Sequence, residues 1–260
     1  METLTPTLDH RVVPLTVSAG EGHAQAQPWA RTLWAAALGQ VALLTLLSLV
    51  SDLNPAGWLA AAGYTAVVFS GLASGLRRTG RVAFGPADKV TLARSALVGC
   101  VTALVADTGH QPALLVGLTV VALLLDGVDG QVARRTGTAS ELGARFDMEV
   151  DAFLILVLSA FVAGQFGLWV LAIGLMRYAF IAAGWIVPWL RVPIPPSMAA
   201  KVVAAAQGAV LIVAAASLMP PVIMAGIVAG ALAALVWSFG RSVLWLYRHE
   251  CLIQGAGRPE

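Results

Sequence analysis

Residues 126–151 read DGVDGQVARRTGTASELGARFDMEVD, and four aspartates recur in this stretch at helical intervals. Asp126 and Asp129 are three residues apart, and Asp147 and Asp151 are four residues apart. Residues at these spacings lie on one face of an α-helix. The link between the two pairs, residues 135–140, is short and contains a Thr-Gly-Thr turn. The sequence therefore predicts two antiparallel neighbouring helices whose acidic faces meet.

The rest of the chain is unusually apolar. Of its 260 residues, 58% are hydrophobic and 12% are charged, whereas about a quarter of an ordinary soluble domain is charged. This composition excludes a disordered chain, and a net charge of +2 gives no basic surface for a nucleic-acid partner. The two cysteines, Cys100 and Cys251, cannot form a disulfide framework. What remains is an integral membrane protein.

Eight segments approach the length of about 20 mostly apolar residues that a transmembrane helix needs. The apolar runs are continuous, not alternating, and this favours helices over a β-barrel. Glycine and proline mark the short links between them. The sequence thus predicts an all-α integral membrane protein with spans at 30–51, 56–76, 88–107, 112–134, 141–164, 167–190, 197–218 and 221–247.

The distribution of Lys and Arg predicts the orientation. With the N-terminus in the cytoplasm, the basic residues gather on the cytoplasmic side, and the outer links around 53, 109, 165 and 219 contain none. Both termini are then cytoplasmic, with residues 1–27 as a disordered tail and 249–260 as a second tail. The skew of 14 Arg to 2 Lys indicates a GC-rich bacterial genome, and hence a multi-pass protein of the plasma membrane.

The four aspartates need an explanation, because a charge in a membrane helix costs several kcal/mol unless it faces a partner or a polar cavity. Either some carboxyl groups are protonated, or divalent cations neutralise them. Oxygen ligands suit Mg²⁺, Mn²⁺ or Ca²⁺, and four carboxylates could bind two ions in a site for phosphoryl displacement. Gly130, Ala133 and Gly143 on the same faces leave room for a ligand, although close helix packing also uses small residues.

The acidic stretch resembles the signature of the CDP-alcohol phosphotransferase family. Eight fixed identities occur at the family's spacing: Asp126, Asp129, Gly130, Ala133, Arg134, Gly143, Asp147 and Asp151. The resemblance implies a six-helix catalytic core over residues 81–248, preceded by two additional transmembrane helices within 28–80. It also implies transfer of a phosphatidyl group from a CDP-linked donor, typically CDP-diacylglycerol, to a polar alcohol acceptor, with release of CMP, in phospholipid biosynthesis.

The resemblance also implies roles for the residues of the motif. The four aspartates would bind two Mg²⁺ or Mn²⁺ ions, and Asp151 would act as the general base on the acceptor hydroxyl. Gly130, Ala133 and Gly143 would line the cytidine pocket. Arg134 would contact phosphate or nucleotide, or else would anchor the helix end at the membrane surface.

Residues at the start of the third predicted helix resemble a second element of the family. Thr91 and Arg94 are one turn apart, as in the Thr-x-x-Arg that lies near the nucleotide in family members. Asp88 stands where the family has Asn, and its residue type favours an N-cap. The alternative for this segment is a helix cap followed by an interfacial arginine.

Three further cations are candidates for an acceptor pocket. Arg177 lies about ten residues from either end of its predicted helix, so it should face a cavity or pair with one of the motif aspartates. Lys201 could join it, or could extend to the membrane surface. Arg191, at a helix end, is the third, with an anchoring role as its alternative. Together they resemble the basic pocket of family members that use phosphorylated acceptors.

Two other classes of function are compatible with acids in the membrane. An ion-coupled transporter also uses intramembrane carboxylates, but these aspartates cluster at one end of the bundle, away from the midplane. A silent scaffold would have no need of all four acids. The acceptor alcohol cannot be identified from the sequence, and the resemblance leaves a homodimer open.

Overall fold

The computed structural model describes residues 28–79, 84–107, 111–136, 140–191 and 198–256. All regular secondary structure in these ranges is helical. Two short 3-10 helices, Leu168–Val170 and Pro188–Arg191, flank α6. The eight α-helices are α1 (Pro28–Ser51), α2 (Pro55–Thr79), α3 (Pro86–Ala106), α4 (Pro112–Thr136), α5 (Glu141–Phe166), α6 (Leu171–Ile186), α7 (Met198–Ala215) and α8 (Pro221–Ala256).

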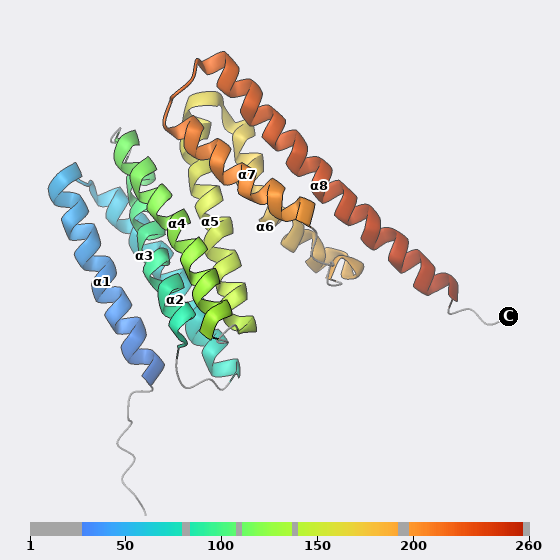
Figure 1. The fold of residues 1–260 in the computed structure, drawn as a ribbon, viewed down its shortest axis with the longest axis horizontal. Helices are drawn as coiled ribbons and strands as arrows, with labels where there is room; N and C mark the ends of the chain where they lie inside the picture. The colour runs from blue at the N-terminus through green and yellow to red at the C-terminus, as the bar shows by residue number, and fades with distance from the viewer. Residues whose placement is uncertain (1–27, 80–83, 108–110, 137–139, 192–197, 257–260) are drawn as a thin grey trace, which may run out of the picture.

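Helix α3 is at the centre of the bundle formed by α1 to α5 (Figure 1). It contacts α1, α2, α4 and α5, and α5 in turn contacts α6 and α7. Residues that face these neighbours, such as Val98, Val101 and Ala103, are completely buried. The long helix α8 packs mainly against α7 and slopes away from the bundle. Helices α3, α4 and α5 therefore lie together, and they carry the acidic stretch.

Six helices of the described ranges are long and apolar enough to cross a membrane: α1, α2, α3, α6 with its 3-10 turn, α7 and α8. In α4 the described apolar part is Pro112–Gly127, which contains Asp126 near its end. Helix α5 begins with several charged residues and is not among the six. All eight predicted helices are thus present, while membrane crossing by all eight stays a prediction.

The predicted span 167–190 is present as Leu168–Ile186, with an irregular start and an earlier end. Gly167 ends α5 with a φ of 104°, a conformation that glycine adopts without the steric penalty of a side chain. A 3-10 turn follows, α6 ends at Ile186, and Pro188 begins a second 3-10 helix, because proline lacks the N–H that a continuing helix would donate. Helix α8, by contrast, continues through Ala256, into the segment predicted as a C-terminal tail.

Capping interactions determine where α3 and α5 begin. The prediction of Asp88 as the N-cap was wrong: Gly85 is the N-cap of α3, and the Asp88 carboxylate, one turn inside, accepts a hydrogen bond of 2.9 Å from the Gly85 N–H. In α5 the N-cap is Ser140, whose Oγ accepts from the Gly143 N–H at 3.0 Å. Both caps satisfy N–H groups that the first turn leaves without intrahelical partners.

Candidate active site

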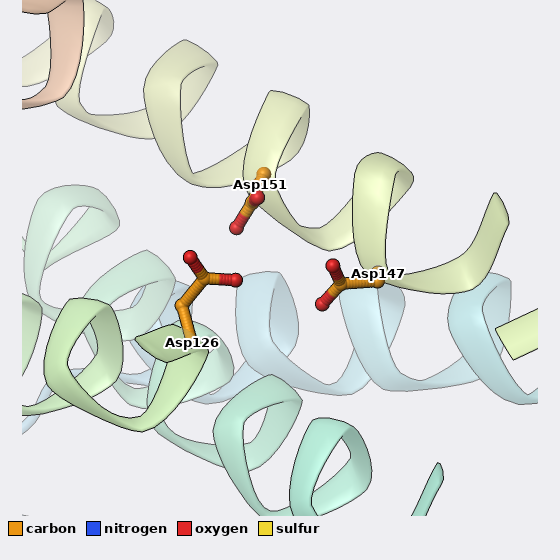
Figure 2. Close-up of side chains that lie close together, drawn as sticks. All are labelled: Asp126, Asp147 and Asp151. Carbon is orange, nitrogen blue, oxygen red and sulfur yellow. The ribbon is translucent and has the colours of Figure 1, made fainter. Parts of the chain in front are cut away.

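Three of the four aspartates come together between α4 and α5. One carboxylate oxygen each from Asp126, Asp147 and Asp151 lies within 4.8 Å of the other two. Figure 2 shows Asp126 extending from α4 toward α5, where Asp147 and Asp151 lie one turn apart. We call these three residues the aspartate triad. Asp129 lies in the same helix as Asp126, and its side chain is outside the described part of the structure.

The guanidinium of Arg94, from α3, forms ion pairs with all three members of the triad. Its Nη1 contacts Asp126, and its Nη2 contacts Asp147 and, at 3.3 Å, Asp151. The arginine side chain is 1% exposed, whereas the three carboxylates are 35–43% exposed. Arg94 therefore forms the buried floor of the site, and the carboxylates keep an accessible side.

The charges of this cluster do not balance. Among the described side chains, three carboxylates surround one guanidinium, and such an excess of like charge in a membrane bundle needs a further cation or proton. Hard divalent cations bind carboxylate oxygens at about 2.0–2.6 Å, so oxygens on opposite sides of one ion are about 4–5 Å apart. The spacing within the triad matches this requirement. The residues present thus fit Mg²⁺ or Mn²⁺.

The contact between Arg94 and the triad was missed by the sequence analysis, which assigned Arg94 to the nucleotide. One signal was available, because a cation in an apolar helix needs an acidic partner and the nearest conspicuous acids are those of the motif. Thr91, one turn before Arg94, is 4% exposed on the same buried side of α3. The arginine and a metal ion would use the same three carboxylates, so we expect them to compete for the triad.

Gly143 lies where the first turns of α3 and α5 approach each other. A β-carbon at this position would be 2.4 Å from Oδ1 of Asp88 and 2.9 Å from Oγ of Ser140. The absent side chain therefore makes room for the two helix caps. Whether it also makes room for a nucleotide stays a prediction. The other predicted nucleotide residues, Gly130, Ala133 and Arg134, belong to α4, and their side chains are outside the described part.

The three cations predicted to bind the acceptor have different surroundings. Arg177 of α6 pairs with Glu149 of α5 at 2.5 Å, so its acidic partner is not one of the motif aspartates. Glu149 follows Asp147 by two residues and is about 200° away around the helix. Lys201 is exposed near the start of α7. Arg191 ends the second 3-10 helix, with its side chain outside the described residues.

The region that contains this site also carries the resemblance to known proteins. The model of the family described as CDP-alcohol phosphatidyltransferase matches residues 85–239. The chain belongs to this family. The match begins at the N-cap of α3, contains all four motif aspartates, and leaves α1 and α2 outside. Searches among curated proteins and among solved structures returned no match.

Membership in the CDP-alcohol phosphatidyltransferase family makes the chain a transferase of phospholipid biosynthesis that moves a phosphatidyl group from a CDP-alcohol. The family depends on metal in general, and the aspartate triad is the group of residues in the described structure that suits such an ion.

Proposed function

We propose that the protein transfers a phosphatidyl group from CDP-diacylglycerol to a polar alcohol and releases CMP, with Mg²⁺ or Mn²⁺ as cofactor. One observation carries this proposal. The aspartate triad, with the Arg94 guanidinium beneath it, lies inside the region that matches the family. Nothing about the triad favours the transporter alternative, in which the acids would line an ion pathway.

The proposed metal site consists of Asp126, Asp129, Asp147 and Asp151. When bound, the metal ions would offset the charge of the donor diphosphate and stabilise the charge that develops at the reacting phosphorus. Two carboxylates of α5 and one of α4 converge to within 4.8 Å of one another. The backbones of the two helices thus place them for a shared cation.

Asp151 is the proposed general base. Its carboxylate is the most exposed of the triad, at 43%, and it is therefore the member that a substrate reaches most easily. Asp151 takes the proton of the acceptor hydroxyl while the oxygen attacks the β-phosphorus of the donor. A new P–O bond forms, the bond between the β-phosphorus and the bridging oxygen breaks, and CMP leaves with that oxygen.

The remaining residues are assigned to the two substrates. Thr91, Arg94, Gly130, Ala133, Arg134 and Gly143 would contact the cytidine nucleotide. Arg94 fits this role because its guanidinium lies against the carboxylates and can bind phosphate as soon as cations replace it there. Arg177, Lys201 and Arg191 would bind the acceptor, in which case Arg177 would have to exchange Glu149 for the substrate.

The proposed arrangement in the membrane follows the positive-inside rule. All eight helices would cross the plasma membrane of a bacterium, with both termini and the aspartate triad on the cytoplasmic side. Residues 81–248 would form the catalytic core, and α1 and α2 would be additional to it. The proposed partners are the lipid donor, the alcohol acceptor and membrane lipid, with a homodimer as the proposed assembly.

The test is a CMP-release assay on the purified full-length protein with CDP-diacylglycerol and a panel of acceptors: glycerol 3-phosphate, inositol phosphate and serine. We expect release that requires Mg²⁺ or Mn²⁺ and stops with a chelator. Asp151→Asn should abolish turnover, whereas Glu141→Gln should not, because Glu141 is 81% exposed and its partner among the described residues is Arg145 in the same helix. Absence of metal-dependent CMP release with every acceptor would contradict the proposal.

A further inference from the structure

A groove runs between α2, α5 and α6 on the outside of the bundle. Its volume is about 680 Å³, within the range of sites that bind small molecules. The walls are almost entirely apolar, and they include Gly63, Val67 and Gly71 of α2, Phe146 and Phe153 of α5, and Leu175 of α6. The two glycines lack side chains that would otherwise project into the groove, because nothing lies within 4 Å of the position of either β-carbon.

The groove is separate from the aspartate triad. Of its lining residues in α5, Glu149 follows Asp147 by two positions and Phe153 follows Asp151 by two. A step of two residues is a rotation of about 200° around a helix, so most of the groove lining of α5 lies on the face opposite the triad, with Phe146 and Val150 at its flanks. One wall is formed by α2, which lies outside the region that matches the family. A molecule in the groove would therefore not be the reacting lipid.

The two ends of the groove differ in charge. Arg145 and Glu149 line it near the start of α5, and their side chains are 75% and 50% exposed. Beyond them the lining of α5 continues to Leu156 through apolar residues. The distance from Leu142 to Leu156 along the helix axis is about 21 Å at 1.5 Å per residue. One leaflet of the hydrocarbon core is about 15 Å thick, so the groove is long enough for an acyl chain.

We propose that this groove binds one acyl chain of a bilayer phospholipid that is not a substrate. Its headgroup is zwitterionic and lies against the two ion pairs at the mouth, Arg145 with Glu141 at 2.7 Å and Arg177 with Glu149 at 2.5 Å, whose charges sum to zero. This occupant complements both the apolar walls and the opposite charges at the mouth. A second copy of the chain in the groove is the alternative occupant that the test below distinguishes. The inference is independent of the reaction proposed above.

The test uses variants that fill the groove. Leucine at positions 63 and 71 has space in the groove and is a better helix former than glycine, so the double variant Gly63→Leu/Gly71→Leu should fold. Gly39→Leu is the matched control, because Gly39 of α1 also has nothing within 4 Å of its β-carbon position and does not line the groove. A thermal unfolding curve in detergent verifies that each variant is folded.

The probe is phosphatidylethanolamine with a photoactivatable diazirine in one acyl chain, mixed with phosphatidylglycerol in nanodiscs that contain the full-length protein. We expect cross-links to peptides of α2 and α5 that face the groove, with a yield about fivefold lower in the double variant and unchanged in Gly39→Leu. Arg145→Gln should lower the yield about threefold. The proposal would be overturned if the double variant were labelled as strongly as the natural protein, or if two copies of the chain were cross-linked to each other through groove residues.

Discussion

Gly143 of α5 and Asp88 of α3 are so close that a β-carbon on the glycine would lie 2.4 Å from a carboxylate oxygen of the aspartate. The carboxylate cannot easily withdraw, because Asp88 is 6% exposed and caps the first turn of its own helix through the Gly85 N–H. This contact brings the starts of α3 and α5 together. It thereby places Arg94 and the two aspartates of α5 at the same level of the bundle.

Replacement of Gly143 by alanine should destabilise the protein. Alanine gains about 1 kcal/mol over glycine in a helix, but overpacking costs about 1–3 kcal/mol and displacement of the Asp88 cap costs about 1 kcal/mol. We expect a net loss of about 1–3 kcal/mol, which lowers the melting temperature by several degrees. Thermal unfolding in detergent measures this change.

Gly117→Ala is the control for that variant, because a β-carbon on Gly117 of α4 would have no neighbour within 4 Å. It should be slightly stabilising, through helix propensity alone. In a protein that already carries Asp88→Ala, the change Gly143→Ala should lower the free energy of unfolding by less than it does in the natural protein. The reason is that the Asp88 oxygen close to the new β-carbon is absent. If the losses of free energy of unfolding in Asp88→Ala and Gly143→Ala simply added in the double variant, the proposed contact would be contradicted.

Removal of the buried cation should strengthen metal binding. Arg94→Gln leaves the three carboxylates without the guanidinium that they share, so a divalent ion no longer competes with it. The variant should melt at a lower temperature than the natural protein without metal, and Mn²⁺ should raise its melting temperature by a larger amount. CMP release should nevertheless fall, because Arg94 is also a proposed nucleotide contact.

Arg145→Gln is the matched control for this experiment, since Arg145 lies on α5 but pairs with the exposed Glu141. Its response to Mn²⁺ should equal that of the natural protein. If Arg94→Gln weakened the stabilisation by Mn²⁺, Arg94 would be a support for the carboxylates and not a competitor of the ion.

The ion pair between Arg177 and Glu149 should contribute to stability. Arg177→Met and Glu149→Gln each remove one partner of the pair, and each should lower the melting temperature. The double variant should lose less free energy of unfolding than the two single variants lose together, with a coupling free energy of the order of 1 kcal/mol.

If Arg177 also binds the acceptor, the KM for the acceptor should be well above that of Glu149→Gln in the variant Arg177→Met. Equal KM values would remove Arg177 from the acceptor site.

Removal of the Tyr64 hydroxyl should stabilise the protein. Tyr64 of α2 is 7% exposed, stacks on Phe153 with ring centroids 4.7 Å apart, and its hydroxyl has no hydrogen-bond partner among the described residues. Tyr64→Phe keeps the stacking and eliminates a buried unsatisfied group, a gain of about 1 kcal/mol. Tyr247→Phe, at an exposed position, should leave the melting temperature unchanged. A decrease for Tyr64→Phe would show that the hydroxyl has a partner after all.

The sequence analysis was most successful where periodicity carries the information. Long apolar runs predicted eight helices, and the structure has all eight near the predicted positions. The predicted span 167–190 ends four residues earlier, at Ile186, because one glycine and one proline act locally on the backbone and a hydropathy window averages over them. The prediction of Asp88 as N-cap was wrong by one turn, since the same carboxylate can cap a helix from the first turn through a capping box.

The spacing of the motif also predicted that the acidic faces of two neighbouring helices would meet, and Asp126, Asp147 and Asp151 do meet. It could not predict that Arg94 would join them, or that Arg177 would pair with Glu149. Periodicity specifies the face of a helix on which a side chain lies. It does not specify the neighbouring helix on which that face packs.

The sequence by itself therefore determined the class of the protein, the positions of its helices and the two aspartate faces, because these depend on contacts within one helix or between two helices joined by a short link. Only the tertiary structure decided the acidic partners of Arg94 and Arg177, the reason for Gly143 and the existence of a groove between α2, α5 and α6. These features depend on the rotation and axial register of helices that are distant in the sequence, and side-chain packing across the whole bundle sets both.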